Sequence, residues 1–350
     1  MKFLTITIDY LPMPGGVARY IDTFCEAFGS SMHVVADIGD VQTSVCDKTF
    51  SVEYRQFMQQ KWPRWMGAVH ELAKRDVDLI FTHHVLPLGI ACLMNKRRTN
   101  TEYVVVLHGM DFDLATRNMW KRWITRQVLR EARAVVTNTH ALAQRVERFV
   151  HVEPLVVHPQ PYVQAAKSIS SNTFSIVSVG RLVERKGIQR VLNALTLIPH
   201  LHDQLHYSIL GGDGPFKQEL ERMIIDLGME DLVTLTVDPT DEQIQYAYKT
   251  SQLFVLPTVT TALDREGFGI VYHEAAQFGI PSIASNIPGV DEAVINGQTG
   301  ILVNSDQELI DAMTTLFHNE ELRKTLGDNA REHVRTSRAM IEDLKQNLGL

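Results

Sequence analysis

The chain has 350 residues, 45% of them hydrophobic and 21% charged, which predicts a globular protein of two domains. The net charge of −7 is uneven, because the first 165 residues carry 19 Lys and Arg against 16 Asp and Glu, whereas the remainder carries 15 against 25. The acidic second half argues against nucleic acid as the main partner. The mildly basic first half suits an anionic acceptor or an anionic membrane surface.

No apolar run reaches the ~20 residues that a membrane-spanning helix needs. Residues 1–9 alternate in polarity like a strand and do not resemble a leader. The cysteines Cys25, Cys46 and Cys92 lack metal-ligand or redox spacing, which is typical of small buried side chains in a reducing compartment. We therefore expect a cytoplasmic protein, with peripheral binding to the inner face of a membrane as a further expectation.

Short β-branched runs alternate with stretches of helical period, which predicts parallel sheets covered by helices. Strands are expected in the first half near residues 3–8, 33–36, 79–82, 103–107, 134–137 and 155–157. In the second half they are expected near residues 174–179, 206–210, 232–237, 253–256, 282–284 and 301–303. The small, polar segment 164–172 is typical of a linker.

These patterns predict an α/β fold of two doubly wound, Rossmann-like domains at residues 1–165 and 173–335. A helix at 336–350 follows, with docking back on the first domain as one option. Such sheets bind ligands at the carboxyl ends of their strands, so we expect both domains to face a central cleft.

Two glycines, Gly15 and Gly16, follow the first strand just before a helical period that begins at Val17. Their amides can approach a ligand at the helix N-terminus, a position suited to phosphate. A tight turn without a ligand is the structural alternative. The dinucleotide fingerprint Gly-x-Gly-x-x-Gly is absent from this turn, which argues against a Rossmann dehydrogenase.

A basic turn follows the first strand of the second domain. Arg181 stands at the end of this strand, and Lys186 comes just before a helix. Two fixed cations can neutralise a pyrophosphate without a metal ion, the Arg as a fork and the Lys as a point charge. A solvated charge run is the structural alternative, and we expect Arg185 to be part of one.

The most specific segment pairs two carboxylates, Glu266 and Glu274, across the glycines Gly267 and Gly269. Helical period begins near Ile270. Glu266 is therefore expected in a loop, where it can accept hydrogen bonds from sugar hydroxyls. The first amides of the helix favour a phosphate, and Glu274 is placed to hold both ribose hydroxyls. Interaction with the helix dipole explains either carboxylate singly, but it does not explain the pair together with the glycines.

Two further motifs stand directly after the ends of predicted strands. His108 precedes Gly109 at the end of a strand that has a buried pattern, so it is expected at the cleft. Residues 211–215 read Gly-Gly-Asp-Gly-Pro and are expected to form a tight, mainly structural turn.

Together these motifs resemble those of the retaining GT-B glycosyltransferases of family four. The resemblance runs from Gly15 to about Val303, in order, and residues 264–272 are similar to members that transfer mannose from GDP-mannose to phosphatidylinositol mannosides. The motifs that carry this resemblance are Gly15-Gly16, His108-Gly109, Gly180-Arg181-x4-Lys186-Gly187, Gly212-Asp213-Gly214-Pro215 and Glu266-x7-Glu274.

The resemblance implies a hexosyltransferase that takes a mannose- or glucose-type unit from a nucleoside-diphosphate sugar to a glycan, lipid-linked or small-molecule acceptor. Arg181 and Lys186 would hold the pyrophosphate, Glu266 the hexose and Glu274 the ribose, and His108 would touch the donor sugar near its sixth carbon. No metal or cofactor is expected. The other donor contacts would come from Gly15, Gly16, Gly267, Phe268, Gly269, Ile270 and Val271.

Two stretches depart from the family pattern. Residues 235–239 lack the usual Phe-Leu-Gly run, and 288–292 lack the first Gly and the Pro of Gly-Gly-x-Pro-Glu. The base of the donor and the acceptor loop therefore stay open. A GT-B sugar-nucleotide epimerase and a catalytically silent nucleotide-sugar-binding scaffold remain as alternatives.

One helix, expected over residues 120–130, combines an apolar and a basic stripe. Trp120, Trp123, Ile124 and Val128 form the first, and Arg122, Arg126, Arg130 and Arg133 the second. A core-facing helix with a solvated basic face is the plain interpretation. The alternative is that the basic face binds an anionic acceptor at a membrane surface.

Overall fold

The computed structural model describes residues 1–13, 15–38, 48–58, 63–163, 173–260 and 266–350. The chain divides into an N-terminal unit, Met1–Gln160 with Arg338–Leu350, and a C-terminal unit, Pro161–Ser337. The expected linker, 164–172, lies outside the described residues. The sequence predicted that the first domain ends at residue 165 and that a C-terminal helix begins at residue 336.

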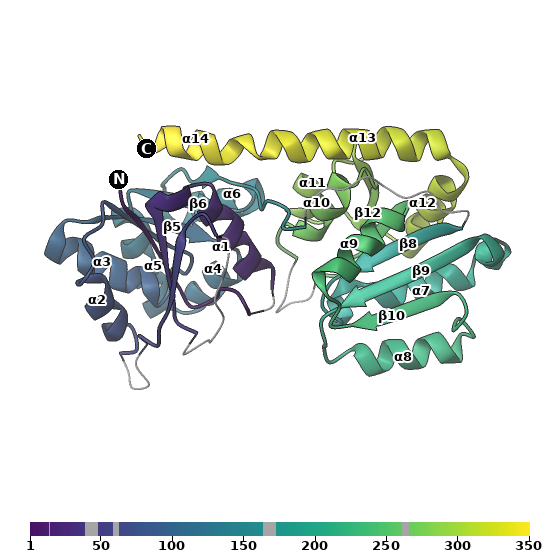
Figure 1. The fold of residues 1–350 in the computed structure, drawn as a ribbon, viewed down its shortest axis with the longest axis horizontal. Coiled ribbons are helices and arrows are strands. Elements are labelled where there is room, and N and C mark those ends of the chain that lie inside the picture. The colour runs from purple at the N-terminus through teal and green to yellow at the C-terminus, as the bar shows by residue number, and fades with distance from the viewer. Residues whose placement is uncertain (14, 39–47, 59–62, 164–172, 261–265) are drawn as a thin grey trace. The chain divides into compact units, whose positions relative to one another are not determined.

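The N-terminal unit is built on one parallel sheet in the order β3-β2-β1-β4-β5-β6-β7 (Figure 1). Its strands are β1 Phe3–Thr7, β2 Met32–Ala36, β3 Ser51–Tyr54, β4 Leu79–Thr82, β5 Glu102–Leu107, β6 Ala134–Thr137 and β7 Leu155–Val156. The sequence predicted all of these strands except β3. This strand pairs with β2 at the sheet edge, and its residues are partly or fully exposed, so it lacks the apolar pattern that marks the others.

Helices cover both faces of this sheet because alternate strand residues point to opposite sides. Val104 and Val106 pack with α1 and α14, whereas Val105 and Leu107 pack with the core formed by α2, α3, α5 and α6. The helices are α1 Gly16–Glu26, α2 Met66–Leu72, α3 Leu88–Thr99, α4 Met110–Ala115, α5 Met119–Glu131, α6 His140–Val150 and α14 Ala339–Asn347, with a short 3-10 turn η1 Gly29–Ser31.

The C-terminal unit has a second parallel sheet in the order β10-β9-β8-β11-β12-β13 (Figure 1). All six strands expected from the sequence are present, with ends that shift by at most one residue. They are β8 Phe174–Val179, β9 Leu205–Gly211, β10 Val233–Val237, β11 Leu253–Leu256, β12 Ser282–Ser285 and β13 Gly300–Val303. The two Rossmann-like α/β units predicted from the sequence are thus confirmed.

Around the second sheet lie two 3-10 helices and seven α-helices among the described residues. They are η2 Glu184–Lys186, α7 Ile188–Thr196, η3 Pro199–Gln204, α8 Lys217–Asp226, α9 Asp241–Thr250, α10 Ile270–Gln277, α11 Val290–Ala293, α12 Asp306–His318 and α13 Glu320–Ser337. A single large apolar cluster fills this unit.

The helix expected near Trp120 is α5, and only half of its apolar stripe faces the core, where Val128 is buried and Ile124 packs against the same cluster. Trp120 and Trp123 are 63% and 56% exposed, so they do not face the core. The basic stripe is not simply solvated either, because the Arg126 guanidinium lies 4.7 Å from the ring centre of Phe149, at the end of α6. Arg130 donates to the carbonyl of Val150 at 3.3 Å. These arginines therefore satisfy the carbonyl end of a neighbouring helix.

One glycine brings two strand ends of the second sheet together. Gly187, between η2 and α7, has φ of 71°, and a Cβ there would come within 2.0 Å of the carbonyl oxygen of Pro257. Only glycine can take this backbone conformation and leave room for Pro257. The turn after β8 is thereby held against the chain that follows β11, at the point where strand order reverses.

We expect Gly187→Ala to lower the free energy of unfolding of the C-terminal unit by roughly 3 kcal/mol, from a left-handed backbone plus a clash. Gly228→Ala is the matched control, since Gly228 has φ of 63° with no atom within 4 Å of a Cβ. The control should cost only about 1 kcal/mol. Urea unfolding curves measure both values, and equal losses would contradict the close approach at Gly187.

Candidate active site

The turn after β8 carries the basic residues that were predicted to bind phosphate. Arg181 is exposed, whereas Lys186 is only 7% exposed. The stem of Lys186 packs on the backbone of Gly180, where a Cβ would come within 3.3 Å of Cε. Lys186 therefore lies at the carboxyl ends of β8 and β11, and parallel sheets of this order bind their ligands at such a switch point.

The carboxylate of Glu266 binds two cations of this turn. Its Oε2 accepts hydrogen bonds from Nζ of Lys186 at 2.6 Å and from Nη1 of Arg185 at 2.7 Å. All three side chains are about nine-tenths buried. Burial alone would raise the pKa of Glu266, but the charges of Lys186 and Arg185 outweigh it and lower the pKa to about 2. The cluster as a whole keeps one positive charge.

The expectation that Arg185 is a solvated charge is wrong. Its side chain is 10% exposed and bound to Glu266, and its carbonyl accepts from the amide of Val259 at 2.7 Å, just beyond β11. The partner lies 81 residues away along the chain, so local pattern could not reveal the pair. Sequence analysis thus missed one of the two cations that contact Glu266.

Helix α10 begins at Ile270, as its periodicity predicted. Gly269 caps it with φ of 78°, and a Cβ at this position would come within 2.4 Å of the Tyr272 ring. The Tyr272 amide donates to the Gly269 carbonyl at 3.0 Å. In the described part of the chain no hydrogen bond engages the amides of Gly269, Ile270 and Val271, so they remain as donors at the helix N-terminus. Phe268 is buried beside them.

Glu274 lies in a different environment from the one expected. Glu274 is 0% exposed, and its Oε2 accepts a hydrogen bond from the Tyr248 hydroxyl at 3.1 Å. The side chain therefore lies inside the C-terminal unit, not at an open edge. A ribose can reach this carboxylate only if the groups that cover it move. The sequence placed Glu274 on the correct helix, but its burial depends on neighbouring elements such as α9, which supplies Tyr248.

The N-terminal unit gathers a second polar cluster at the carboxyl ends of β1, β4 and β5, three neighbouring strands. His108 follows β5, as predicted, and its amide donates to Oδ1 of Asp111 at 2.9 Å. His84 follows β4, and its Nε2 lies 3.0 Å from Oδ2 of Asp9. His83 Nδ1 lies 3.3 Å from Nε2 of His108.

Burial and charge set the protonation of this cluster. Burial, helped by the charge of His84, lowers the pKa of His108 to about 3, so its imidazole is neutral at pH 7. Burial lowers the pKa of His83 as well. The hydrogen bond with His84 keeps the pKa of Asp9 below its usual value. Sequence analysis found His108 but missed His83, His84 and Asp9, although the same rule, a polar residue directly after a buried strand, applies to them.

Gly15 and Gly16 stand where the sequence placed them, at the start of α1. Gly15 is the N-cap residue and Gly16 the first helical residue, and both are exposed. Their position leaves the first turn of α1 open to an anion.

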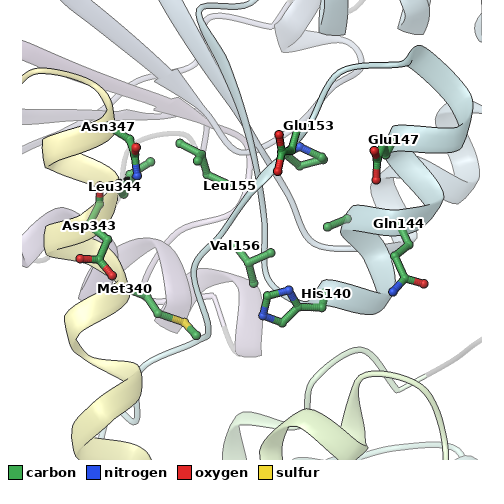
Figure 2. Close-up of a pocket in the computed structure, with 12 residues that line it drawn as sticks. His140, Gln144, Glu147, Glu153, Leu155, Val156, Met340, Asp343, Leu344 and Asn347 are labelled. Carbon is green, nitrogen blue, oxygen red and sulfur yellow. Dashed lines mark hydrogen bonds between the residues drawn. The ribbon is translucent and has the colours of Figure 1, made fainter.

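One pocket of about 420 Å³ lies in the N-terminal unit, and none of these residues is among those that line it. Figure 2 shows α6 and α14 on its two sides with β7 between them. The carboxylates of Glu147, Glu153 and Asp343 line it. An acidic pocket repels a nucleoside diphosphate, so the donor site does not lie there.

Two family models match the chain. "Glycosyltransferase Family 4" matches residues 14–161, and "Glycosyl transferases group 1" matches residues 162–333. Together they span most of both units.

Relatives and solved structures agree with these matches. An uncharacterized glycosyltransferase of Methanocaldococcus jannaschii is 24% identical over 75% of this chain and 71% of its own length. A GDP-mannose-dependent α-(1-6)-phosphatidylinositol monomannoside mannosyltransferase of Mycolicibacterium smegmatis is 35% identical over 40% of this chain and 36% of its own length. Anabaena HepE, crystallised with UDP and glucose, superposes with a TM-score of 0.81 at 19% identity, covering 100% of this chain and 99% of HepE.

We expect Glu266→Gln to lower the free energy of unfolding by about 3 kcal/mol at neutral pH. This figure is the free energy that corresponds to lowering the pKa of Glu266 from its ordinary 4.5 to about 2 on folding. A lowered folded-state pKa stabilises the protein above pH 4.5, and this stabilisation is lost as the pH falls toward 2. The gap between wild type and variant should therefore shrink across that range.

Urea unfolding at a series of pH values measures this gap. Glu219→Gln is the control, because Glu219 is paired with Arg222 on the surface of α8 and should contribute less than about 1 kcal/mol. A Glu266→Gln protein as stable as the wild type at pH 7 would show that the cluster contributes nothing.

Proposed function

The chain belongs to the GT-B glycosyltransferases of the family four type, and on that premise we propose a retaining hexosyltransferase. The donor is a nucleoside-diphosphate sugar of mannose or glucose type, and the acceptor is a glycan, a lipid-linked sugar or a small molecule. The observation that carries this proposal is the carboxylate of Glu266 held between Lys186 and Arg185 at the switch point of the second sheet.

The ion cluster suits a donor that brings both phosphate and hydroxyl groups. A pyrophosphate can replace Glu266 as the partner of Lys186, because the pyrophosphate of a nucleotide sugar carries two negative charges against the one of a carboxylate. Exposed Arg181 adds a second fixed cation after β8. Oε1 of Glu266 has no hydrogen-bond partner among the described residues, so it remains to accept bonds from sugar hydroxyls. The carboxylate thus keeps the cations in place until the donor arrives.

Helix α10 supplies the second part of the donor site in this proposal. The amides of Gly269, Ile270 and Val271 point out of a helix N-terminus and favour a phosphate. Backbone from Gly267 and the adjoining buried Phe268 shapes the turn. Glu274 takes the ribose once the groups covering it move. His108, neutral at pH 7, contacts the hexose near its sixth carbon, and Gly15 with Gly16 closes on the pyrophosphate.

Charge stabilisation in this scheme comes from the protein itself. Lys186, Arg181 and the α10 amides stabilise the negative charge that develops on the leaving diphosphate. Attack from the same face as the leaving group, with a phosphate oxygen taking the acceptor proton, retains the anomeric configuration. Positioning and electrostatics then supply the rate, and the reaction needs neither a protein nucleophile nor a metal ion.

Printed names of similar proteins support the choice of donor class. The Mycolicibacterium enzyme is GDP-mannose-dependent, and HepE was crystallised with UDP and glucose. Both point to a hexose on a nucleoside diphosphate, and they differ in the base. Residues 235–239, which depart from the family pattern, are where the base would be selected.

A thermal-shift panel of UDP-, GDP- and ADP-sugars tests the donor. One nucleotide at 100 times its dissociation constant should stabilise the chain by ~2.7 kcal/mol. With that donor and an acceptor, turnover should survive EDTA and should fall roughly 100-fold in Lys186→Ala. Lys324→Ala, an exposed lysine on α13, is the control and should retain full activity.

Strict dependence on Mg²⁺, or full activity of Lys186→Ala, would contradict the scheme. Release of free nucleotide only when an acceptor is present would exclude the epimerase alternative. Binding without turnover toward any acceptor would favour a silent scaffold.

We also propose that the N-terminal unit contacts an anionic membrane surface, through different residues from the basic stripe. Large exposed apolar side chains gather within residues 110–123, where Met119 is 80% exposed and the Trp120 and Trp123 rings stack at 5.6 Å. Exposed Arg117 and Lys121 lie among them. Aromatic rings flanked by basic residues are typical of interfacial binding. None of the described helices is long and apolar enough to cross a bilayer.

Replacing both Trp120 and Trp123 by Ala should reduce binding to anionic phospholipid vesicles by at least about 100-fold, since burying each ring contributes roughly 1.5–3 kcal/mol. The control is Ile225→Ala with Tyr246→Ala, which removes two equally exposed side chains from the C-terminal unit. Vesicle co-sedimentation measures binding, and two of the four tryptophans report it by fluorescence. Equal binding of wild type and the double Trp variant would refute this surface, as would no binding by either.

A further inference from the structure

A buried histidine beside His108 has no part in the scheme above. His83 follows β4, is 0% exposed, and lies edge to edge with His108, with ring centres 5.5 Å apart and planes at 16°. Its Nδ1 lies 3.3 Å from Nε2 of His108. Two neutral imidazoles in this arrangement share one hydrogen bond, so one ring must donate and the other must accept.

The surroundings of His83 decide which ring donates. Phe24 and Tyr20 lie edge-on to it, with ring centres at 5.3 and 6.1 Å. Within the described residues its Nε2 is buried without a hydrogen-bond partner. A buried N–H without a partner is rarer than a buried lone pair without one. The lone pair therefore lies on Nε2 of His83, and the proton lies on Nδ1.

We propose that His83 is a positioning residue that fixes the tautomer and ring plane of His108. The Nδ1–H of His83 donates to Nε2 of His108, so His108 carries its own proton on Nδ1. Unassisted imidazole of histidine favours the opposite tautomer, with the proton on Nε2. His108 thereby presents an N–H donor to a ligand oxygen, of the kind that a sugar hydroxyl or phosphate provides.

Other groups around the pair are compatible with this arrangement. Tyr20 lies edge-on to His108 as well, at 5.0 Å, and its hydroxyl donates to the carbonyl of Val157 at 3.1 Å, so it does not compete. The titratable neighbours are Asp9, His84 and Asp111, and they act on His108 through space or through its backbone amide. Among the described residues no hydrogen bond reaches Nδ1 of His108. That atom is left for a ligand.

Nitrogen-15 NMR of histidine-labelled protein tests the tautomer without any substrate. In the wild type we expect the His108 ring, assigned by its loss in His108→Gln, to carry the proton on Nδ1. In His83→Phe, which keeps an aromatic ring but loses the hydrogen bond, the proton should move to Nε2. His83→Asn keeps a donor near the Nδ1 position and should restore the wild-type spectrum. An Nε2-protonated His108 in the wild type, or no change in His83→Phe, would overturn the proposal.

Kinetics then separate this inference from the proposed function on which its ligand rests. In His83→Phe we expect the kcat of glycosyl transfer to fall at least 10-fold, because His108 in the wrong tautomer presents a lone pair where a donor is needed. The melting temperature of this variant should equal that of the wild type. His83→Asn should recover most of that loss. A shifted tautomer with unchanged kcat would support the role of His83 and overturn the hexose contact of His108.

Discussion

The ion cluster of Glu266 with Lys186 and Arg185 is the interaction on which the C-terminal site depends. Placing three charged groups about nine-tenths out of water costs free energy, and only short hydrogen bonds in a fixed geometry offset that cost. The geometry is fixed because the turn after β8 is pressed against the chain after β11 at Gly187. The result is a rigid pair of cations with one net positive charge, suited to a diphosphate.

Both units apply the same constraint to their sites. In a parallel sheet all strands end at one edge, so residues far apart in the chain meet there without a dedicated scaffold. At the first sheet this edge brings Asp9, His84 and His108 together from three strands. At the second it brings Lys186 to Glu266. The first cluster centres on the neutral imidazoles of His83 and His108, and the second on paired charges.

The N-terminal unit also shows how charge is divided between structure and surface. Arg126 and Arg130 look like a binding stripe in the sequence, yet they cap and cover the end of α6. Trp120 and Trp123 are exposed on the same helix, with exposed Arg117 and Lys121 beside them. An arginine beside a helix C-terminus satisfies carbonyls that would otherwise lack partners, so Arg126 and Arg130 serve α6 even though Arg130 stays exposed.

The sequence by itself determined the two α/β units, nearly all of their strands, and the start of α10 at Ile270. These follow from local periodicity and from glycines that only special backbone conformations require, both of which neighbouring residues decide. Tertiary structure decided the rest. The edge strand β3 lacks a buried pattern, the bond of Arg185 to Glu266 joins residues 81 apart, and the burial of Glu274 depends on neighbouring elements. Side-chain partners and burial are properties of packing, and periodicity along the chain does not encode them.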